Sequence, residues 1–254
     1  MSSSIPLSIQ SYSTVEELSV ALADLFVTLS VDAIQTRGRF TVGLSGGSLP
    51  KILAADLVKR VDAVEWEKLT VFFCDERLVP LDHEDSNYRL CREELFSKVP
   101  IPEEQIHKIN PDLLENAEEV AEDYKDQLIH VFAHVNSAKF PVFDLLLLGI
   151  GPDGHTCSLF PGHQTLEDTI DWVIPEENSP KPPPRRITFT LPTLNHAHNV
   201  CFVATGEGKQ DILKRIIDEN DQKIPSALVQ PVHGNLFWFL DDKASAKLTL
   251  REKK

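Results

Sequence analysis

The chain of 254 residues is poor in basic residues, in cysteine and in long apolar runs, and each shortage excludes a class of protein. Lysine and arginine number 25 against 39 aspartate and glutamate residues, which gives a formal net charge of −14. This balance argues against a nucleic-acid partner, because a phosphate backbone requires a large basic surface. No window reaches the roughly 20 apolar residues that a membrane span requires, so no membrane partner is expected either.

The four cysteines, Cys74, Cys91, Cys157 and Cys201, lie too far apart for a paired zinc motif. Three of them lie in or beside apolar segments, which indicates reduced core thiols in a cytoplasmic protein. The first ten residues lack the basic and apolar regions of a secretory signal. The histidines and acidic residues show no metal-ligand spacing, so no metal is predicted.

Apolar segments alternate with amphipathic ones along the chain. Thr14 and Glu17 form a capping box, and Gly38 is suited to end the helix that follows them. Helices are predicted at 13–36, from 49 onward, and at 87–99, 116–132, 209–218 and 241–248; strands are predicted at 39–44, 69–74, 143–148, 172–174, 185–191, 199–205 and 236–240. The alternation predicts one α/β domain over residues 1–254, with a doubly wound, mostly parallel sheet and helices on both faces.

The stretch at 143–161 is the most informative part of the sequence. A short apolar strand, 143–148, leads into a glycine-rich loop that holds Asp153 and His155. Open α/β sheets bind ligands at the carboxyl ends of their strands, which is where this loop begins. Histidine exchanges a proton near neutral pH, and Asp153 could orient it, so the pair is a candidate catalytic site.

Two alternative interpretations of this loop stay open at the level of the sequence. Residues 149–154 have the G-x-G-x-x-G spacing of a dinucleotide site, and Asp168 follows at the distance of a ribose-binding acid. Against this, Pro152 removes an N–H group and Asp153 would repel a pyrophosphate. The other alternative is a structural turn in which His155 only caps a helix.

A second loop combines a strand end, small residues and the start of a helix. Its residues are Ser45, Gly46, Gly47 and Ser48, and Leu49-Pro50 begins the next helix. Outward-pointing backbone N–H groups and the helix dipole favour an anion at such a position. Lys209, predicted on the first turn of another helix, opposes that helix dipole, which suggests a nearby anion. A tight turn without a ligand and an exposed lysine are the alternatives.

Taken together, these motifs resemble the 6-phosphogluconolactonase family. The matching blocks are Ser45-Gly-Gly-Ser48, Asp75-Glu-Arg-x-Val-Pro80, Ser86-Asn-Tyr88, 149–161, 179–188, Gly206-x-Gly-Lys209 and 226–230. The resemblance implies a phosphorylated sugar lactone as substrate, namely 6-phospho-D-glucono-1,5-lactone hydrolysed to 6-phosphogluconate. It also implies a monomer with a Rossmann-like fold that binds no dinucleotide and needs no cofactor.

The resemblance also implies roles for individual residues. His155 matches the general base, while Asp153 and Asp75 match acids that orient His155 or the sugar. Arg77 matches a site arginine that stabilises an oxyanion or orders its loop. The phosphate-binding positions match Ser45, Gly46, Gly47, Ser48, Arg186 and Lys209.

Two rival functions use the same fold. Glucosamine-6-phosphate deaminases follow the Asp-Gly-His core with Phe-Asn-Glu-Pro, but the matching stretch here is Leu159-Phe-Pro-Gly162, which has no carboxylate. A non-catalytic sugar-phosphate sensor would be expected to lose His155 or the acidic residues, and all of them are present. The sequence therefore favours the lactonase.

Overall fold

The computed structural model describes residues 7–133, 139–249 and 252–253. Within them, seven strands form one sheet in which all neighbours run parallel. In spatial order the strands are β10 (Glu252–Lys253), β1 (Leu7–Tyr12), β9 (Asn235–Asp241), β8 (Asn199–Ala204), β5 (Leu145–Leu148), β2 (Phe40–Leu44) and β3 (Leu69–Phe73). Five of these strands were predicted, and β1 and β10 were not. That residues 1–254 form one domain remains a prediction.

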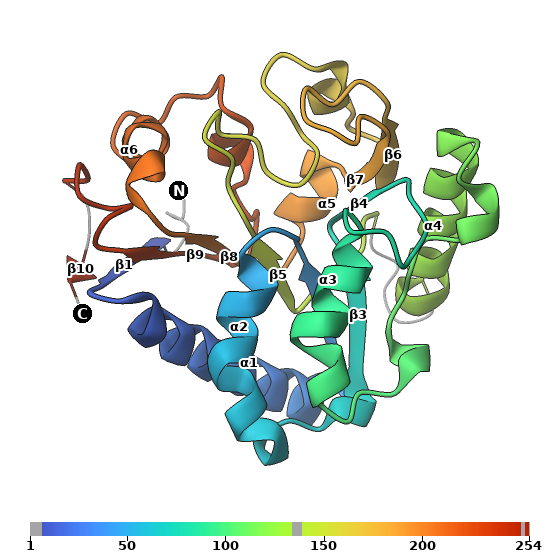
Figure 1. The fold of residues 1–254 in the computed structure, drawn as a ribbon, viewed down its shortest axis with the longest axis horizontal. Helices are drawn as coiled ribbons and strands as arrows, with labels where there is room; N and C mark the ends of the chain where they lie inside the picture. Colours follow the sequence, from blue (N-terminus) through green and yellow to red (C-terminus); the bar gives the residue numbers. More distant parts are fainter. Residues whose placement is uncertain (1–6, 134–138, 250–251, 254) are drawn as a thin grey trace.

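Helices cover both faces of this sheet, as the doubly wound architecture requires (Figure 1). In β5, Leu145 and Leu147 pack in one apolar cluster, while Leu146 and Leu148 pack in the other. Alternate strand residues point to opposite faces, so the two clusters lie on opposite sides of the sheet. One side carries α1 (Val15–Arg37), α2 (Leu49–Leu57) and α3 (Asn87–Glu94); the other carries α4 (Ala117–Phe132), α5 (Leu191–Asn195) and α6 (Gln210–Ile217).

Local signals set the ends of α1 as predicted. The Thr14 hydroxyl accepts a hydrogen bond from the Glu17 amide at 3.1 Å. In turn, the Glu17 carboxylate accepts a hydrogen bond from the amide of Ser13 rather than from that of Thr14. Gly38 adopts a left-handed conformation with φ of 78°, and its amide donates to the Ile34 carbonyl.

A second, antiparallel sheet stands beside the ends of the main strands, and the sequence analysis missed it. Its strands are β4 (Asp75–Arg77), β7 (Arg186–Phe189) and β6 (Val173–Glu176), in the order β4-β7-β6. Cys74 joins the two sheets, because its amide donates to Leu44 and its carbonyl accepts from Phe189. The register places Arg77 opposite Arg186. Two cations that are distant in sequence therefore lie side by side.

The predicted helix at 241–248 is wrong. Asp241 is the last residue of β9, and residues 242–247 form turns. The Asp241 carboxylate accepts hydrogen bonds from the amides of Gly206 and Ala244, and the Asp242 amide donates to Tyr12. These contacts hold the segment against the end of β1 and the loop after β8, in place of helical hydrogen bonds.

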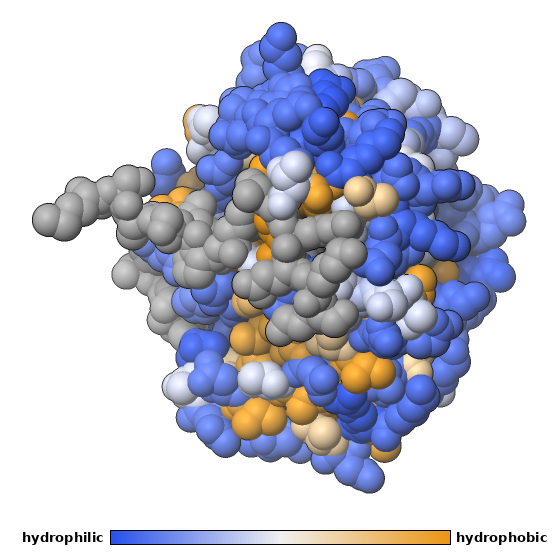
Figure 2. Space-filling model, turned by 90° about the vertical axis from the view of Figure 1, so that its left-hand side faces the viewer, coloured by the Kyte–Doolittle hydropathy of each residue, from blue (hydrophilic) through white to orange (hydrophobic). Residues whose placement is uncertain are grey.

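The predicted helix at 87–99 is also too long, because α3 ends at Glu94. The structure adds short 3₁₀ segments at Val58–Ala63, Trp66–Lys68, Phe96–Lys98, Glu103–Gln105, Pro111–Leu113, Gln164–Glu167, Glu207–Lys209 and Pro225–Leu228. Hydrophilic side chains cover most of the face drawn in Figure 2, and apolar side chains gather in a limited area of it. Among the described residues, no helix has the length and apolar character needed to span a membrane.

Candidate active site

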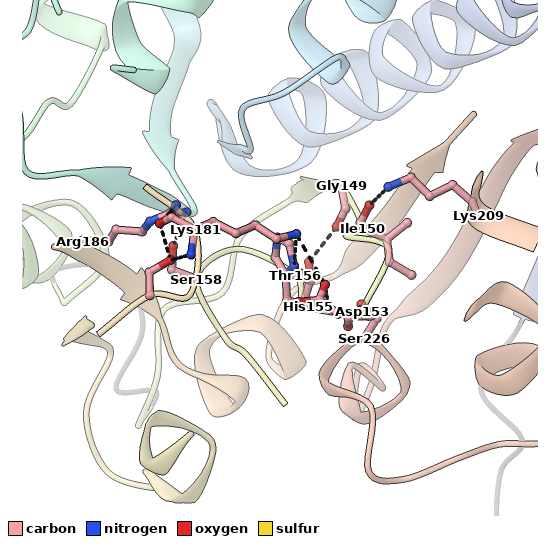
Figure 3. Close-up of polar contacts among 12 residues, drawn as sticks. Gly149, Ile150, Asp153, His155, Thr156, Ser158, Lys181, Arg186, Lys209 and Ser226 are labelled. Carbon is pink, nitrogen blue, oxygen red and sulfur yellow. Dashed lines mark hydrogen bonds and ion pairs between the residues drawn. The ribbon is translucent and has the colours of Figure 1, made fainter. Parts of the chain in front are cut away.

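A cleft of about 230 Å³ opens where β2, β5 and β8 end. Loops from distant parts of the chain meet here because the strands are parallel. All but one of the predicted site residues line it: Ser45, Gly46, Gly47, Ser48, Asp75, Arg77, His155, Arg186 and Lys209. Asp153, the exception, contacts the side chain of His155 (Figure 3).

His155 pairs with Asp153 rather than with Asp75. Its Nδ1 lies 2.5 Å from Asp153 Oδ1. A carboxylate oxygen only accepts, so the shared proton is assigned to Nδ1, which leaves the Nε2 lone pair free. The Phe160 ring packs against the imidazole with 4.7 Å between ring centres. The arrangement gives a histidine in a fixed tautomer that can accept a proton at the edge of the cleft.

The surroundings of the pair keep His155 neutral. Burial lowers the pKa of His155 and outweighs the contact with Asp153, which raises it; the nearby Lys181 ammonium lowers it further. Burial alone would raise the pKa of Asp153, but its hydrogen bond with His155 and the charges of His155 and Lys181 bring that pKa below its ordinary value. Near neutral pH the pair is therefore a neutral imidazole beside a carboxylate.

Close packing fixes the loop that carries the pair. Gly154 has φ of +84°, and a Cβ placed there would come 2.2 Å from Ile224 Cγ2, so a side chain at this position would strain the backbone and displace Ile224. The carbonyl of Gly154 accepts from the Ser226 hydroxyl at 2.7 Å and from the Ser226 amide at 3.1 Å. The Thr156 hydroxyl donates to the Gly149 carbonyl at 2.9 Å. These contacts hold the backbone on both sides of His155.

Across residues 149–163, all of which the structure describes, it lacks the helix that each of the two alternative interpretations of this loop requires. A dinucleotide motif needs a helix that begins at the last glycine. Residues 155–163 instead contain turns and an isolated bridge between Thr156 and Leu159, and His155 caps no helix in the described part of the chain.

Asp75 is buried in a different network. Its Oδ2 accepts from the Ser158 hydroxyl at 2.7 Å, and its backbone carbonyl accepts from Asn87 Nδ2 at 2.8 Å. Asp75 and His155 both line the cleft. Asp75 acts on His155 through its charge, which raises the pKa of the imidazole. It is placed to contact a ligand in the cleft.

Glu76 anchors the start of α3 beneath Arg77. Its carboxylate accepts from the amides of Arg77, Asn87 and Tyr88. Burial raises the pKa of Glu76 to about 7, although these backbone hydrogen bonds act in the opposite direction. Arg77 Nη1 donates to the carbonyl of Asp85 at 2.7 Å. Arg77 therefore orders the loop before α3 and also lines the cleft.

The other end of the cleft is suited to an anion. The amides of Gly46, Gly47 and Ser48 have no hydrogen-bond partner among the described residues, and they precede the first turn of α2. Lys209 Nζ donates to the Ile150 carbonyl at 2.6 Å. Burial lowers the pKa of Lys209, and the Lys181 charge adds to this effect. A bound anion would offset both.

Arg186 is buried and largely occupied by the protein itself. Nε donates to the Pro183 carbonyl at 3.0 Å, Nη2 donates to the carbonyls of Lys181 and Pro182, and Nη1 donates to the Ser158 hydroxyl. A guanidinium has five N–H groups, so little donor capacity is left for a ligand.

Sequence reasoning assigned no individual role to Lys181, Ser158 or Ser226. Lys181 Nζ lies 3.4 Å from His155 Nδ1 and 3.7 Å from Asp153 Oδ1. Each of these residues was inside a matching motif, but no local pattern indicates which partner its side chain reaches. The only available signal was the motif itself.

Comparison with known proteins agrees with this geometry. The sequence model of the family described as "Glucosamine-6-phosphate isomerases/6-phosphogluconolactonase" matches residues 13–238. The chain belongs to this family. It is 49% identical over 250 residues to a "Probable 6-phosphogluconolactonase" of Schizosaccharomyces pombe, covering 95% of this chain and 96% of the relative. It is also 49% identical to the 6-phosphogluconolactonase of Homo sapiens, covering 98% and 97%.

Solved structures of the family share the fold. The 6-phosphogluconolactonase from Trypanosoma brucei superposes with a TM-score of 0.83 at 31% sequence identity, over 97% of this chain and 100% of that one. The predicted Rossmann-like α/β fold is therefore confirmed.

Proposed function

We propose that the protein is an enzyme that hydrolyses 6-phospho-D-glucono-1,5-lactone to 6-phosphogluconate. The observation that carries the proposal is the His155–Asp153 pair, which faces an anion-binding loop across one cleft. Family members named 6-phosphogluconolactonase, similar over nearly the whole chain, support the same substrate.

His155 is the general base of the proposed reaction. Its Nε2 removes a proton from a water molecule while the water oxygen attacks the C1 carbonyl of the lactone. Asp153 holds the proton on Nδ1 and stabilises the imidazolium that forms. The imidazolium then returns the proton to the ring oxygen as the bond between C1 and that oxygen breaks. Proton transfer of this kind contributes typically about 10²–10⁴-fold in rate.

The remaining cleft residues bind the substrate. Arg77 stabilises the negative charge that develops on the carbonyl oxygen, and Asp75 accepts hydrogen bonds from sugar hydroxyls. The phosphate is bound by Lys209, by the free N–H of Arg186 and by the loop of Ser45, Gly46, Gly47 and Ser48. The few cations of an acidic chain thus gather where the phosphorylated substrate must bind.

The test is lactone hydrolysis on freshly made 6-phosphogluconolactone, corrected for its spontaneous rate. We expect activity in the wild type and a fall in kcat of about 10² or more in His155→Ala, with KM little changed. A wild type that is inactive on the lactone would refute the proposed reaction. A His155→Ala variant as active as wild type would leave the reaction but remove His155 as its base.

Deamination of glucosamine 6-phosphate is the rival within the family. The pattern of the deaminases places a glutamate shortly after the histidine, whereas here Leu159 and Phe160 are both buried and the Phe160 ring packs on His155. Release of ammonia from glucosamine 6-phosphate is the second arm of the assay, and we expect none. A sensor would bind 6-phosphogluconate without hydrolysing the lactone. The monomeric state and the cytoplasmic location remain predictions.

A further inference from the structure

A lysine outside the cleft contacts both members of the catalytic pair. Lys181 Nζ lies 3.7 Å from Asp153 Oδ1 and 3.4 Å from His155 Nδ1 (Figure 3). The imidazole and the ammonium therefore meet at one carboxylate oxygen. Lys181 is not among the residues that line the cleft, and the two site residues that its ammonium reaches are His155 and Asp153.

The backbone of Lys181 is held firmly although its side chain is 39% exposed. The buried Arg186 donates from Nη2 to the Lys181 carbonyl at 2.9 Å, and the Ser179 hydroxyl donates to the same carbonyl at 2.8 Å. The Lys181 amide lies 3.2 Å from that hydroxyl, and the Ser179 amide donates to Pro184. These contacts set the point from which the ammonium reaches the pair.

The proton arrangement follows from the short contact. An oxygen lone pair and a nitrogen lone pair cannot face each other at 2.5 Å. A proton therefore lies between Asp153 Oδ1 and His155 Nδ1. An ammonium has donors and no lone pair. Lys181 therefore forms an ion pair with the Asp153 carboxylate, and its positive charge opposes the second proton that would make the imidazole cationic.

We propose that Lys181 is a positioning residue that, by sharing Asp153 Oδ1 with His155, keeps the imidazole neutral and ready to accept a proton from water. This proposal deepens the proposed function and rests on it. Asp153 and Asp75 favour the imidazolium, burial and Lys181 oppose it, and the cations Arg77, Arg186 and Lys209 line the same cleft. Among the groups around His155, Lys181 is the cation in direct reach of Nδ1.

The test compares Lys181→Met, which removes the charge and keeps the stem, with Lys181→Arg, which keeps the charge. Lys98→Met is the matched control. Lys98 is an exposed lysine whose Nζ lies 3.6 Å from Glu94 Oε2, so this substitution removes the same charge from another part of the surface. The kcat/KM for the lactone is measured between about pH 5 and 8, because its acid limb reports the base of the free enzyme. The His155 imidazole is titrated by NMR in the same variants, with the signal assigned from His155→Ala.

In Lys181→Met we expect the acid limb and the NMR midpoint to move together to higher pH by about 0.5 to 1 unit, because the cation that lowers the pKa of His155 is gone. The shift is small because solvent partly screens the Lys181 charge. At pH values below the midpoint, this shift lowers kcat/KM about three- to tenfold. Lys181→Arg and Lys98→Met should keep the wild-type midpoints.

An unchanged midpoint in Lys181→Met overturns the proposal, and so does a KM that rises equally at every pH, which would mean that Lys181 binds substrate. The NMR titration needs no substrate. If the wild type failed to hydrolyse the lactone, the proposed function would fall, while the titration would still decide whether Lys181 controls His155.

Discussion

Replacing Asp153 by asparagine changes one atom and tests the catalytic pair most directly. The carboxylate accepts the Nδ1 proton of His155 at 2.5 Å, and Lys181 Nζ stands 3.4 Å from the same nitrogen. In Asp153→Asn, the amide NH₂ and the ammonium would both present donors to Nδ1. Nδ1 would then become an acceptor and the proton would move to Nε2. The lone pair that should receive a proton from water would be lost.

The expected loss is the whole contribution of the base, about 10²–10⁴-fold in kcat. Since the two residues act as one unit, Asp153→Asn should cost about as much as His155→Ala, and the double variant should be no worse than either. The Asp153 side chain is 37% exposed, so the free energy of unfolding should change by less than about 1 kcal/mol. Any residual activity should have its acid limb at lower pH, because the Asp153 charge raises the pKa of His155.

The assay is steady-state hydrolysis of the fresh lactone, with thermal unfolding measured in parallel. Asp211→Asn is the control, because Asp211 is an exposed residue of α6 that pairs with Lys247. If Asp153→Asn keeps more than about a tenth of the wild-type kcat, the tautomer argument is wrong, because loss of a base should cost at least about 10²-fold. Additive losses in the double variant would show that the two residues act separately.

Three further variants address the loop, the anion site and a buried acid. Gly154→Ala forces a side chain into a φ of +84° and to within 2.2 Å of Ile224, so it should lose about 1–3 kcal/mol of stability in urea unfolding and most of its activity. Lys209→Met should raise KM for the lactone about 10-fold or more, but should change the kinetics of the unphosphorylated lactone little. The pKa of Glu76 rises from its ordinary 4.5 to about 7 on folding, so its contribution to stability is complete below about pH 4.5 and is lost as pH rises through 7. Relative to Glu76→Gln, the wild type should therefore lose up to about 3 kcal/mol across that window in urea unfolding.

Much of the parallel sheet could be predicted because its central strands carry their own signal. Residues 143–148 form an apolar run of the kind that is buried on both faces, and β5 lies within it. β1 has no such run, since Ser8, Gln10 and Ser11 interrupt it. It is a strand because β9 pairs with it along its whole length, and β9 lies more than 200 residues away in sequence. Pairing with a distant partner leaves no local pattern.

The second sheet shows the same limit for the site. Asp75, Glu76 and Arg77 have low strand propensity, and they appeared to be charges that end a strand. They form β4 because β7 supplies the opposing backbone. This pairing turns Asp75 into the cleft and Glu76 toward the start of α3. The position of Asp75 relative to His155 therefore depended on a sheet that propensity could not predict.

Arg186 connects the segment that carries Lys181 with Ser158. The family motif indicates a phosphate ligand, but its N–H groups donate mainly to the carbonyls of 181–183 and to the Ser158 hydroxyl. Ser158 in turn donates to Asp75, and Lys181 reaches His155. One buried guanidinium thus fixes the loop that sets the state of the base and the serine that orients an acid. A planar group with donors on three nitrogens can hold all of these acceptors at once, whereas a lysine ammonium could not. The need for arginine here therefore follows from the protein's own contacts, before any phosphate binds.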